Sequence, residues 1–227
     1  MSERVDAVLF DLDGTLVGSM DPWDRCWVDY AAQHGHSWTD SDRARTHGHG
    51  DWADHLAHVC GSDSPARVVE ACTDLMIGQI QQGQVALLPG IAELIEAAAD
   101  HAITGIVSAS PRRFVHATLR YFDLHRYFPL VLTREDHPHS KPHPAPYLHA
   151  AELLYLSPAH CVAVEDSPAG IRSAAGAGMR VLAIPHPATL IAPADAALVT
   201  HLAANALAAA PWLRNQLGRN ADQALIP

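Results

Sequence analysis

Segments that look like buried β-strands alternate with segments of helical periodicity along most of this chain, and this alternation restricts the fold more than any other feature. Apolar runs of strand length occur at 5–11, 102–110, 130–133, 161–166 and 180–185, and a short sixth strand is predicted at 197–200. Helical patterns lie between them at 90–100, 144–154 and 167–178, and Ser110-Pro111 marks a further helix start, as an N-cap followed by proline. This order predicts an α/β fold with a doubly wound, Rossmann-like parallel sheet.

One long stretch interrupts the alternation. It contains helical patterns at 21–34, 51–60 and 64–82, a Gly/His-rich segment at 46–50 and no strand pattern. We therefore predict a small all-helical cap domain of residues 18–85, inserted into an α/β core of residues 1–17 and 86–227. A chain of 227 residues is long enough for such a core with an insertion.

Polar side chains follow four of the predicted strands at the point where each strand ends. In open parallel sheets, ligands bind beyond the carboxyl ends of the strands, so these side chains are candidates for one site. In chain order they are Asp11 and Asp13, Ser108, Lys141, and the acid pair Glu165-Asp166. Lys141 is the only lysine in the chain, and it lies in a loop stiffened by Pro142 and Pro144.

The four segments resemble the signature motifs of the haloacid dehalogenase-like hydrolase superfamily. They are DLDGT at 11–15, the strand-end serine of VSAS at 107–110, SKPHPAPY at 140–147 and VEDSPAGI at 164–171. The resemblance extends over residues 4–186 and is greatest to members with a helical cap, namely sugar phosphatases that act on substrates such as 2-deoxyglucose 6-phosphate and the related β-phosphoglucomutases. It implies a phosphatase that acts on a small phosphorylated sugar or related metabolite through an aspartyl-phosphate intermediate.

The resemblance implies a role for each acid of the first motif. Asp11, at the end of the first strand, matches the nucleophile that becomes phosphorylated. Asp13 matches the residue that protonates the leaving alcohol and then activates water, while its backbone carbonyl contacts the metal. Dehalogenases of the superfamily lack this second acid, so Asp13 favours phosphate chemistry over carbon–halogen chemistry.

The remaining motif residues match the groups that neutralise and hold the phosphate. Mg²⁺ prefers oxygen ligands, and we expect Asp11 and Asp166 to bind it directly and Glu165 to bind it directly or through water. Lys141 supplies a compact positive charge to the nucleophile and the phosphoryl group. The expected phosphate-binding residues are Gly14, Thr15, Ser108, Ala109 and Lys141, with backbone N–H groups of 13–15 among the donors.

The predicted cap would close over the leaving group and exclude water. The spacing of Trp23 and Trp27, four residues apart, is more typical of packing within a cap helix than of substrate contact. His47 and His49 could ligate Zn²⁺, but a His-x-His pair in a Gly-rich loop is more typical of a flexible hinge or a polar contact to a sugar. The candidates for substrate contact are Trp23, Arg25, Trp27, His47, His49, Asp51, Trp52 and Arg112.

Two other functions fit parts of the sequence. A mutase resembles this chain in the core but uses basic residues to hold a second phosphate, and the cap segment THGHGDWADHL carries acids and histidines instead. Arg43, Arg45 and Arg112 are the available substitutes. A phospho-receiver switch also combines acids, a Ser/Thr and a lysine on such a sheet, but its lysine follows the other motifs, whereas Lys141 precedes Glu165-Asp166.

The amino-acid composition restricts the kinds of partner that this chain can bind. A net charge of −10 disfavours nucleic-acid binding, which depends on basic residues that neutralise phosphates. The N-terminal segment lacks the pattern of a signal peptide, and no apolar run approaches the length of a membrane span. We expect a cytoplasmic monomer or weak homodimer whose partner is a small phosphorylated substrate.

Overall fold

The structure is a computed structural model that describes residues 4–46, 51–61, 64–186 and 189–218. Within these residues, six parallel strands form one sheet in the order β3-β2-β1-β4-β5-β6. The strands are β1 (Ala7–Phe10), β2 (Ile103–Val107), β3 (Leu130–Leu132), β4 (Cys161–Glu165), β5 (Arg180–Ala183) and β6 (His201–Leu202). The predicted doubly wound α/β class is confirmed, and β1 lies between β2 and β4 at the centre of the sheet.

Alternate residues of the central strand face two separate apolar cores. Val8 and Phe10 belong to the core beneath α5 (Ile91–Ala99), α6 (Arg112–Tyr121) and α10 (Ala206–Gly218), whereas Ala7 and Leu9 face α7 (Ala145–Leu153) and α8 (Pro168–Gly176). Burial on both faces explains why the strand sequences are almost continuously apolar. It also fixes the register, because a shift by one residue would exchange the two faces.

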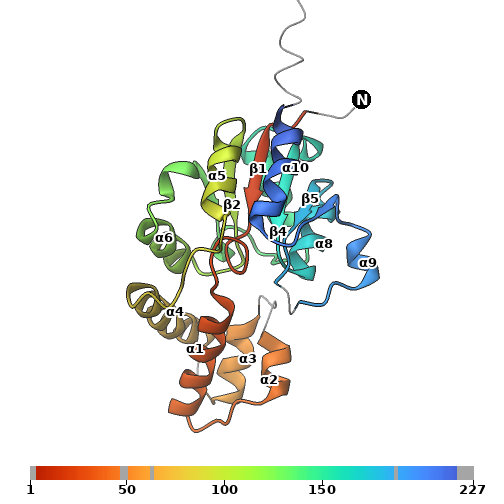
Figure 1. The fold of residues 1–227 in the computed structure, drawn as a ribbon. Helices are drawn as coiled ribbons and strands as arrows, with labels where there is room; N and C mark the ends of the chain where they lie inside the picture. The colour runs from red at the N-terminus through yellow and green to blue at the C-terminus, as the bar shows by residue number, and fades with distance from the viewer. Residues whose placement is uncertain (1–3, 47–50, 62–63, 187–188, 219–227) are drawn as a thin grey trace, which may run out of the picture.

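Four helices between β1 and α5 form the helical cap (Figure 1). They are α1 (Met20–Gln33), α2 (Asp40–Thr46), α3 (Trp52–Val59) and α4 (Pro65–Gln81), and no strand occurs among the described residues of this insertion. The two connecting segments run side by side, because Gly18 N–H donates to Ala86 O at 2.9 Å and Leu88 N–H donates to Leu16 O at 2.9 Å. Both connections therefore lie beyond the carboxyl end of β1, which places the cap over the carboxyl ends of the strands. The domain borders at 17/18 and 85/86 stay a prediction.

Two local expectations were wrong. Helix α6 begins at Arg112 with Pro111 as its N-cap, since the Ser110 hydroxyl donates to Asp13 instead of capping the helix. The short strand expected at 197–200 lies at His201–Leu202, because backbone donors of Ala197 and Leu198 close the turn after α9 (Pro193–Ala196).

The C-terminal segment forms a helix that contains a proline. Helix α10 begins at Ala206 and continues through Pro211. Ala209, Ala210 and Leu213 are buried on its inner side, and α10 packs against α5. The apolar contact with α5 therefore outweighs the backbone hydrogen bond that a proline removes from a helix.

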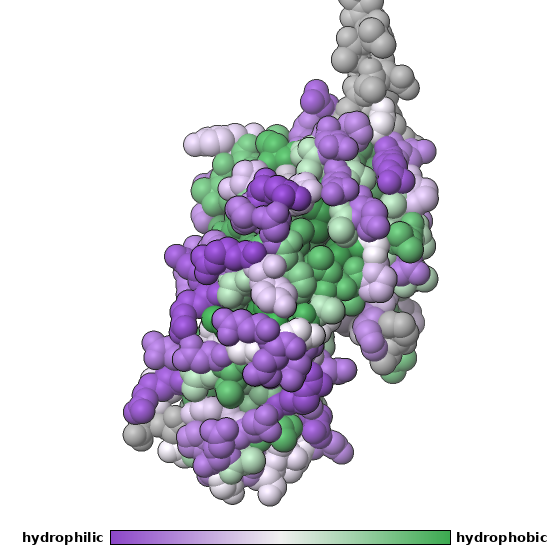
Figure 2. Space-filling model, turned by 60° about the vertical axis from the view of Figure 1, so that its left-hand side comes forward, coloured by the Kyte–Doolittle hydropathy of each residue, from purple (hydrophilic) through white to green (hydrophobic). Residues whose placement is uncertain are grey.

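The surface differs between the two parts of the molecule. In the view of Figure 2, hydrophilic side chains predominate over the cap, whereas apolar side chains gather on the part that contains the sheet. Among the helices that the structure describes, none has the length and apolar character needed to cross a membrane.

Candidate active site

A cavity lies where the carboxyl ends of the strands meet the cap. Residues from the core and from the cap line this cavity together. The first and the last of them in the sequence, Asp11 and Ala169, are 158 positions apart. Those of the core are Asp11, Asp13, Ala109, Ser110, Ser140, Lys141, Asp166, Ser167 and Ala169, and those of the cap are Met20, Trp23, Trp27, Thr46 and Trp52. The fold therefore brings all four signature segments to one cavity wall, and the second of them reaches it at Ala109 and Ser110.

Lys141 joins two carboxylates at the base of this cavity. Its ammonium group lies 2.7 Å from Asp11 Oδ1 and 2.6 Å from Glu165 Oε1, and the side chain is almost completely buried. Burial alone would lower the pKa of Lys141, but the negative charges of Asp11 and Glu165 raise it above its ordinary value. Lys141 is therefore charged at neutral pH and directed at the predicted nucleophile.

Glu165 faces the interior of the core. Its Oε1 also accepts a hydrogen bond of 2.6 Å from Tyr147 Oη, and a β-carbon at Gly170 would lie 1.8 Å from its Oε2. Glu165 is fully buried, and this burial raises the pKa of its carboxyl to about 7, with Lys141 acting in the opposite direction. In this arrangement Glu165 positions the Lys141 ammonium group, in addition to its predicted contact with the metal.

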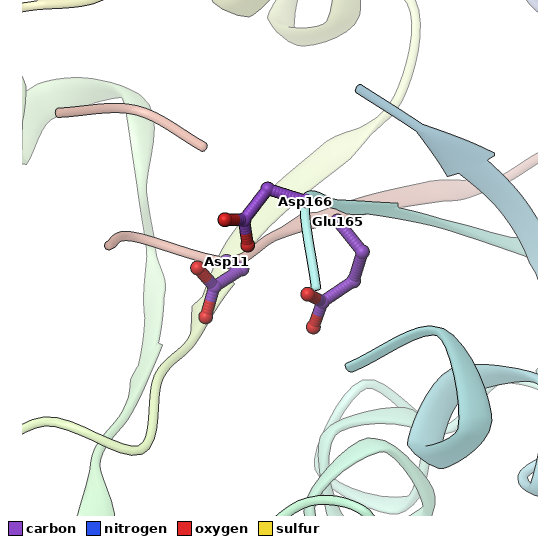
Figure 3. Close-up of side chains that lie close together, drawn as sticks. All are labelled: Asp11, Glu165 and Asp166. Carbon is purple, nitrogen blue, oxygen red and sulfur yellow. The ribbon is translucent and has the colours of Figure 1, made fainter. Parts of the chain in front are cut away.

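Asp11 and Asp166 are the carboxylates best placed for a cation. Figure 3 shows the Asp166 carboxylate directed toward Asp11, whereas the Glu165 carboxylate is turned away from Asp166. One oxygen from each of these three residues lies within 4.8 Å of the others. Burial and the neighbouring charges of Asp11 and Glu165 raise the pKa of Asp166 well above its ordinary value, with Lys141 acting in the opposite direction. Three converging carboxylates that offer only oxygen donors suit Mg²⁺, so the residues fit the predicted metal.

Asp13 is held by three donors from different parts of the chain. Ser19 Oγ donates to Oδ1 at 2.5 Å, Trp23 Nε1 donates to Oδ1 at 3.0 Å, and Ser110 Oγ donates to Oδ2 at 2.5 Å. Burial and the nearby charge of Asp11 raise the pKa of this carboxyl, and the three hydrogen bonds oppose the rise. Because its two side-chain oxygens are engaged, a metal contact would come from its backbone carbonyl, as the family resemblance implies; this contact stays a prediction.

The turn after Asp13 requires glycine. Gly14 has φ +82°, and a β-carbon at this position would lie 2.2 Å from Asp166 Oδ2. Its N–H donates to Val17 O at 2.9 Å, so the phosphate-binding donor expected from Gly14 is already used within the turn. The Thr15 hydroxyl is buried and forms no hydrogen bond with the described residues, and Thr15 is not among the residues that line the cavity.

Replacing Gly14 by Ala is expected to lower kcat at least about tenfold, because the new methyl group must displace the Asp166 carboxylate. Gly83→Ala is the matched control, since Gly83 also has a positive φ, of +71°, but a β-carbon there would meet no described atom within 4 Å. Steady-state kinetics and thermal unfolding of the two variants would separate the collision with Asp166 from backbone strain. Equal kinetic losses in the two variants would contradict this explanation.

Ser108 and Ala109 lie at the end of β2, beside the acids. Ser108 is buried, and its Oγ accepts the N–H of Ser110 at 3.0 Å, which leaves the hydroxyl proton free to be donated. Ala109 lines the cavity. The segment is thus arranged to hold an oxyanion next to Lys141.

The predicted cap residues divide into two groups. Trp23, Trp27 and Trp52 line the cavity. Arg25 does not: it is exposed and lies along a groove between α1 and α4. Asp51 is exposed at the start of α3 and does not line the cavity either, and His47 and His49 lie outside the described residues.

Arg112 was also expected near the substrate, but it is absent from the cavity wall. Its guanidinium pairs with Asp136 at 2.6 Å, and its backbone N–H donates to Glu135 at about 3.0 Å. Both acids belong to the 3₁₀ turn Arg134–Asp136 that follows β3. Arg112 therefore links this turn to the start of α6.

Four contacts of the site were not predicted from the sequence. Ser19 and Ser110 were not assigned as partners of Asp13, and Trp23 was considered as a substrate contact or a packing residue, not as a donor to Asp13. Tyr147, which belongs to the motif SKPHPAPY, was not assigned to Glu165. The periodicity of apolar residues does not predict such contacts, because the partners lie on different helices, strands and loops.

Comparisons with known proteins agree with the fold and the site. The sequence profile of the haloacid dehalogenase-like hydrolases matches residues 5–178. Hexitol phosphatase B of Escherichia coli K12 is 31% identical over 197 residues, which cover 81% of this chain and 85% of that protein. The chain belongs to the haloacid dehalogenase-like hydrolase family, and it is a hydrolase whose relatives include phosphatases.

Solved structures share the fold. CbbY from Rhodobacter sphaeroides in complex with phosphate superposes with a TM-score of 0.79 at 24% identity and covers 91% of this chain and 96% of its own. β-Phosphoglucomutase from Clostridium difficile gives a TM-score of 0.78 at 19% identity, covering 96% and 99%. The family membership excludes the phospho-receiver alternative, since the match extends through the inserted cap that a receiver lacks.

Proposed function

We propose that this chain is a Mg²⁺-dependent phosphatase that hydrolyses the phosphate monoester of a small sugar or related metabolite. The observation that carries the proposal is the group of Asp11, Lys141 and Asp166 beside a fixed Asp13, all in one cavity under the cap. Relatives named hexitol phosphatase and phosphoglycolate phosphatase support this reaction class. The cytoplasmic location and the state as a monomer or weak homodimer stay predictions.

The first step transfers the phosphoryl group to the protein. An Asp11 carboxylate oxygen attacks phosphorus, and the bond between phosphorus and the ester oxygen breaks. Asp13 gives a proton to the departing oxygen, so the alcohol leaves neutral. The raised pKa of Asp13 supports this role, because it increases the fraction of the carboxyl that carries a proton.

The second step restores the enzyme. Asp13, now ionised, takes a proton from a water molecule that attacks the aspartyl phosphate, and inorganic phosphate departs from Asp11. The same carboxyl thus acts first as an acid and then as a base. Its three hydrogen bonds hold it in one orientation for both tasks.

The other residues hold and neutralise the transferring group. Lys141 would contact the phosphoryl oxygens, and Ser108 with the segment around Ala109 and Thr15 would donate hydrogen bonds to them. Asp11 and Asp166 would hold Mg²⁺, with Glu165 bound directly or through water. When bound, the ion supplies positive charge between these carboxylates and the phosphate.

The mutase alternative receives less support from the cavity. A mutase must hold a second phosphate, yet Lys141 is the only cationic side chain among the described residues that line the cavity. Arg112 is paired with Asp136, and Arg43 is paired with Asp24 and Asp40 outside the cavity. These contacts favour hydrolysis over transfer between two positions of one sugar.

A phosphate-release screen tests the proposal. The purified protein is assayed with sugar phosphates, hexitol phosphates, nucleotides and phosphorylated biosynthetic intermediates, with Mg²⁺ or with EDTA. We expect turnover of a small sugar or polyol phosphate, a loss of at least about 10²-fold in EDTA, and recovery when Mg²⁺ is restored. Full activity in EDTA would contradict the metal assignment, and conversion of β-glucose 1-phosphate to the 6-phosphate would contradict the phosphatase assignment.

A further inference from the structure

Three tryptophans form one aromatic cluster on the cap side of the cavity. The ring centroids are 5.9 Å apart for Trp23 and Trp27, 5.5 Å for Trp23 and Trp52, and 5.7 Å for Trp27 and Trp52. Phe114 of the core packs edge-on against Trp23 at 5.2 Å. We call Trp23, Trp27 and Trp52 the tryptophan cluster; its rings are held by one another and by the core, so they form a rigid wall.

The tryptophan cluster borders the part of the cavity that the leaving group must occupy. Trp23 donates from Nε1 to Asp13 Oδ1 at 3.0 Å, and Asp13 is the group proposed to protonate the ester oxygen. The nucleophile and Lys141 occupy the opposite, core side of the same cavity. The alcohol that carries the phosphate therefore extends from Asp13 toward the indole rings.

The described residues on the cap side of the cavity offer no positive charge to that alcohol. They are Met20, Thr46 and the tryptophan cluster. The one cation of the described lining, Lys141, is already paired with Asp11 and Glu165. Against this described lining, a second phosphate or a carboxylate on the leaving group would be buried beside indole rings without a counter-charge, which is strongly unfavourable.

We infer that the substrate is a monophosphate whose leaving group is uncharged and presents an apolar C–H face to the tryptophan cluster. A sugar, a sugar alcohol or a cyclitol meets both requirements, since its hydroxyl groups can reach the serines of the core side while its ring or chain carbons pack on indole. Bisphosphates and phosphorylated sugar acids do not. This inference rests on the proposed function and specifies its substrate class.

Matched substrate pairs test the inference. Glucose 6-phosphate and 6-phosphogluconate differ in a carboxylate at the far end of the leaving group, and fructose 6-phosphate and fructose 1,6-bisphosphate differ in a second phosphate. We expect kcat/KM to be at least about tenfold higher for the uncharged member of each pair. The generic substrate p-nitrophenyl phosphate is included to report phosphatase chemistry by itself.

Binding without turnover gives a second readout. In the Asp11→Asn variant, glucose 6-phosphate should change the tryptophan fluorescence, whereas 6-phosphogluconate should do so only at concentrations about tenfold higher. Trp27→Leu should raise KM for glucose 6-phosphate about tenfold, because it removes one indole ring from the wall on which the substrate carbons pack. Trp38→Phe is the control, because Trp38 belongs to the cap but packs against His36 and His55 outside the cavity, and it should leave this KM unchanged.

The outcomes separate the two levels of the proposal. Comparable kcat/KM values within both pairs, together with hydrolysis of p-nitrophenyl phosphate, would overturn the inference and leave the proposed function standing. Failure to hydrolyse any of these phosphates, p-nitrophenyl phosphate included, would overturn the proposed function and the inference with it. An unchanged KM for glucose 6-phosphate in Trp27→Leu would also overturn the inference.

Discussion

Asp11→Asn is expected to reduce phosphate release to background, a loss of more than about 10⁴-fold, because the amide cannot form the covalent intermediate. This exceeds the roughly 10²–10⁴-fold that an acid–base group contributes, which is the loss expected for Asp13→Asn. Wild-type protein quenched in acid during turnover should carry one phosphoryl group on the peptide that contains Asp11. Kinetics and mass spectrometry of the intact protein and its peptides check these expectations.

The fold should survive this substitution. Asparagine has nearly the volume of aspartate, and it relieves the crowding of negative charge with Glu165 and Asp166, although Lys141 loses one of its two carboxylate partners. Thermal unfolding and circular dichroism therefore serve as controls, and Asp100→Asn, an exposed position at the end of α5, is the matched variant that should retain activity. Substantial turnover by Asp11→Asn, or a phosphoryl group on another residue, would contradict the assignment of the nucleophile.

Lys141→Arg is expected to lower kcat by about 10²–10³-fold even though the positive charge is retained. The ammonium group contacts Asp11 and Glu165 at 2.7 and 2.6 Å and is almost completely buried, and the Tyr147 ring centroid lies 5.2 Å away. A planar guanidinium has more atoms than this pocket accommodates. It would have to shift Glu165, whose far side is already closed by Gly170.

Tyr147→Phe is the companion variant. It removes one hydrogen bond to Glu165 but keeps the lysine and its charge, so a loss of no more than about tenfold is expected. Comparing kcat for the two variants shows whether turnover depends on the compact ammonium group of Lys141 or on every hydrogen bond to Glu165. Near-normal rates for Lys141→Arg would refute the geometric argument and leave charge alone as the requirement.

The strand pattern predicted the core well because burial on both faces produces nearly continuous apolar runs. β1 and β4 are clear for this reason, and the acids that follow them mark the site directly. β6 was misplaced because a strand of two residues at the sheet edge has no pattern of its own. The start of α10 was missed since its packing on α5, a tertiary contact, decides where the helix begins.

In the cap, too, some features were predicted from the sequence and others were not. The helices α1, α3 and α4 follow from periodicity, whereas α2 was not predicted; at seven residues it is too short for a clear period. Arg25 and Arg112 were plausible as substrate contacts because sequence does not reveal which direction a side chain faces. The structure places Arg25 on the outer groove and pairs Arg112 with Asp136.

Family, fold class and the chemical groups of the site can all be predicted from the amino-acid sequence, since strand-end residues in a parallel sheet meet at one edge whatever the loops do. How those groups work together depends on contacts that form only in the folded protein. The tertiary structure places Ser19, Trp23 and Ser110 on Asp13, and it encloses Lys141 between Asp11 and Glu165. Such contacts join residues up to 130 positions apart, and their geometry depends on side-chain packing, which no local pattern encodes.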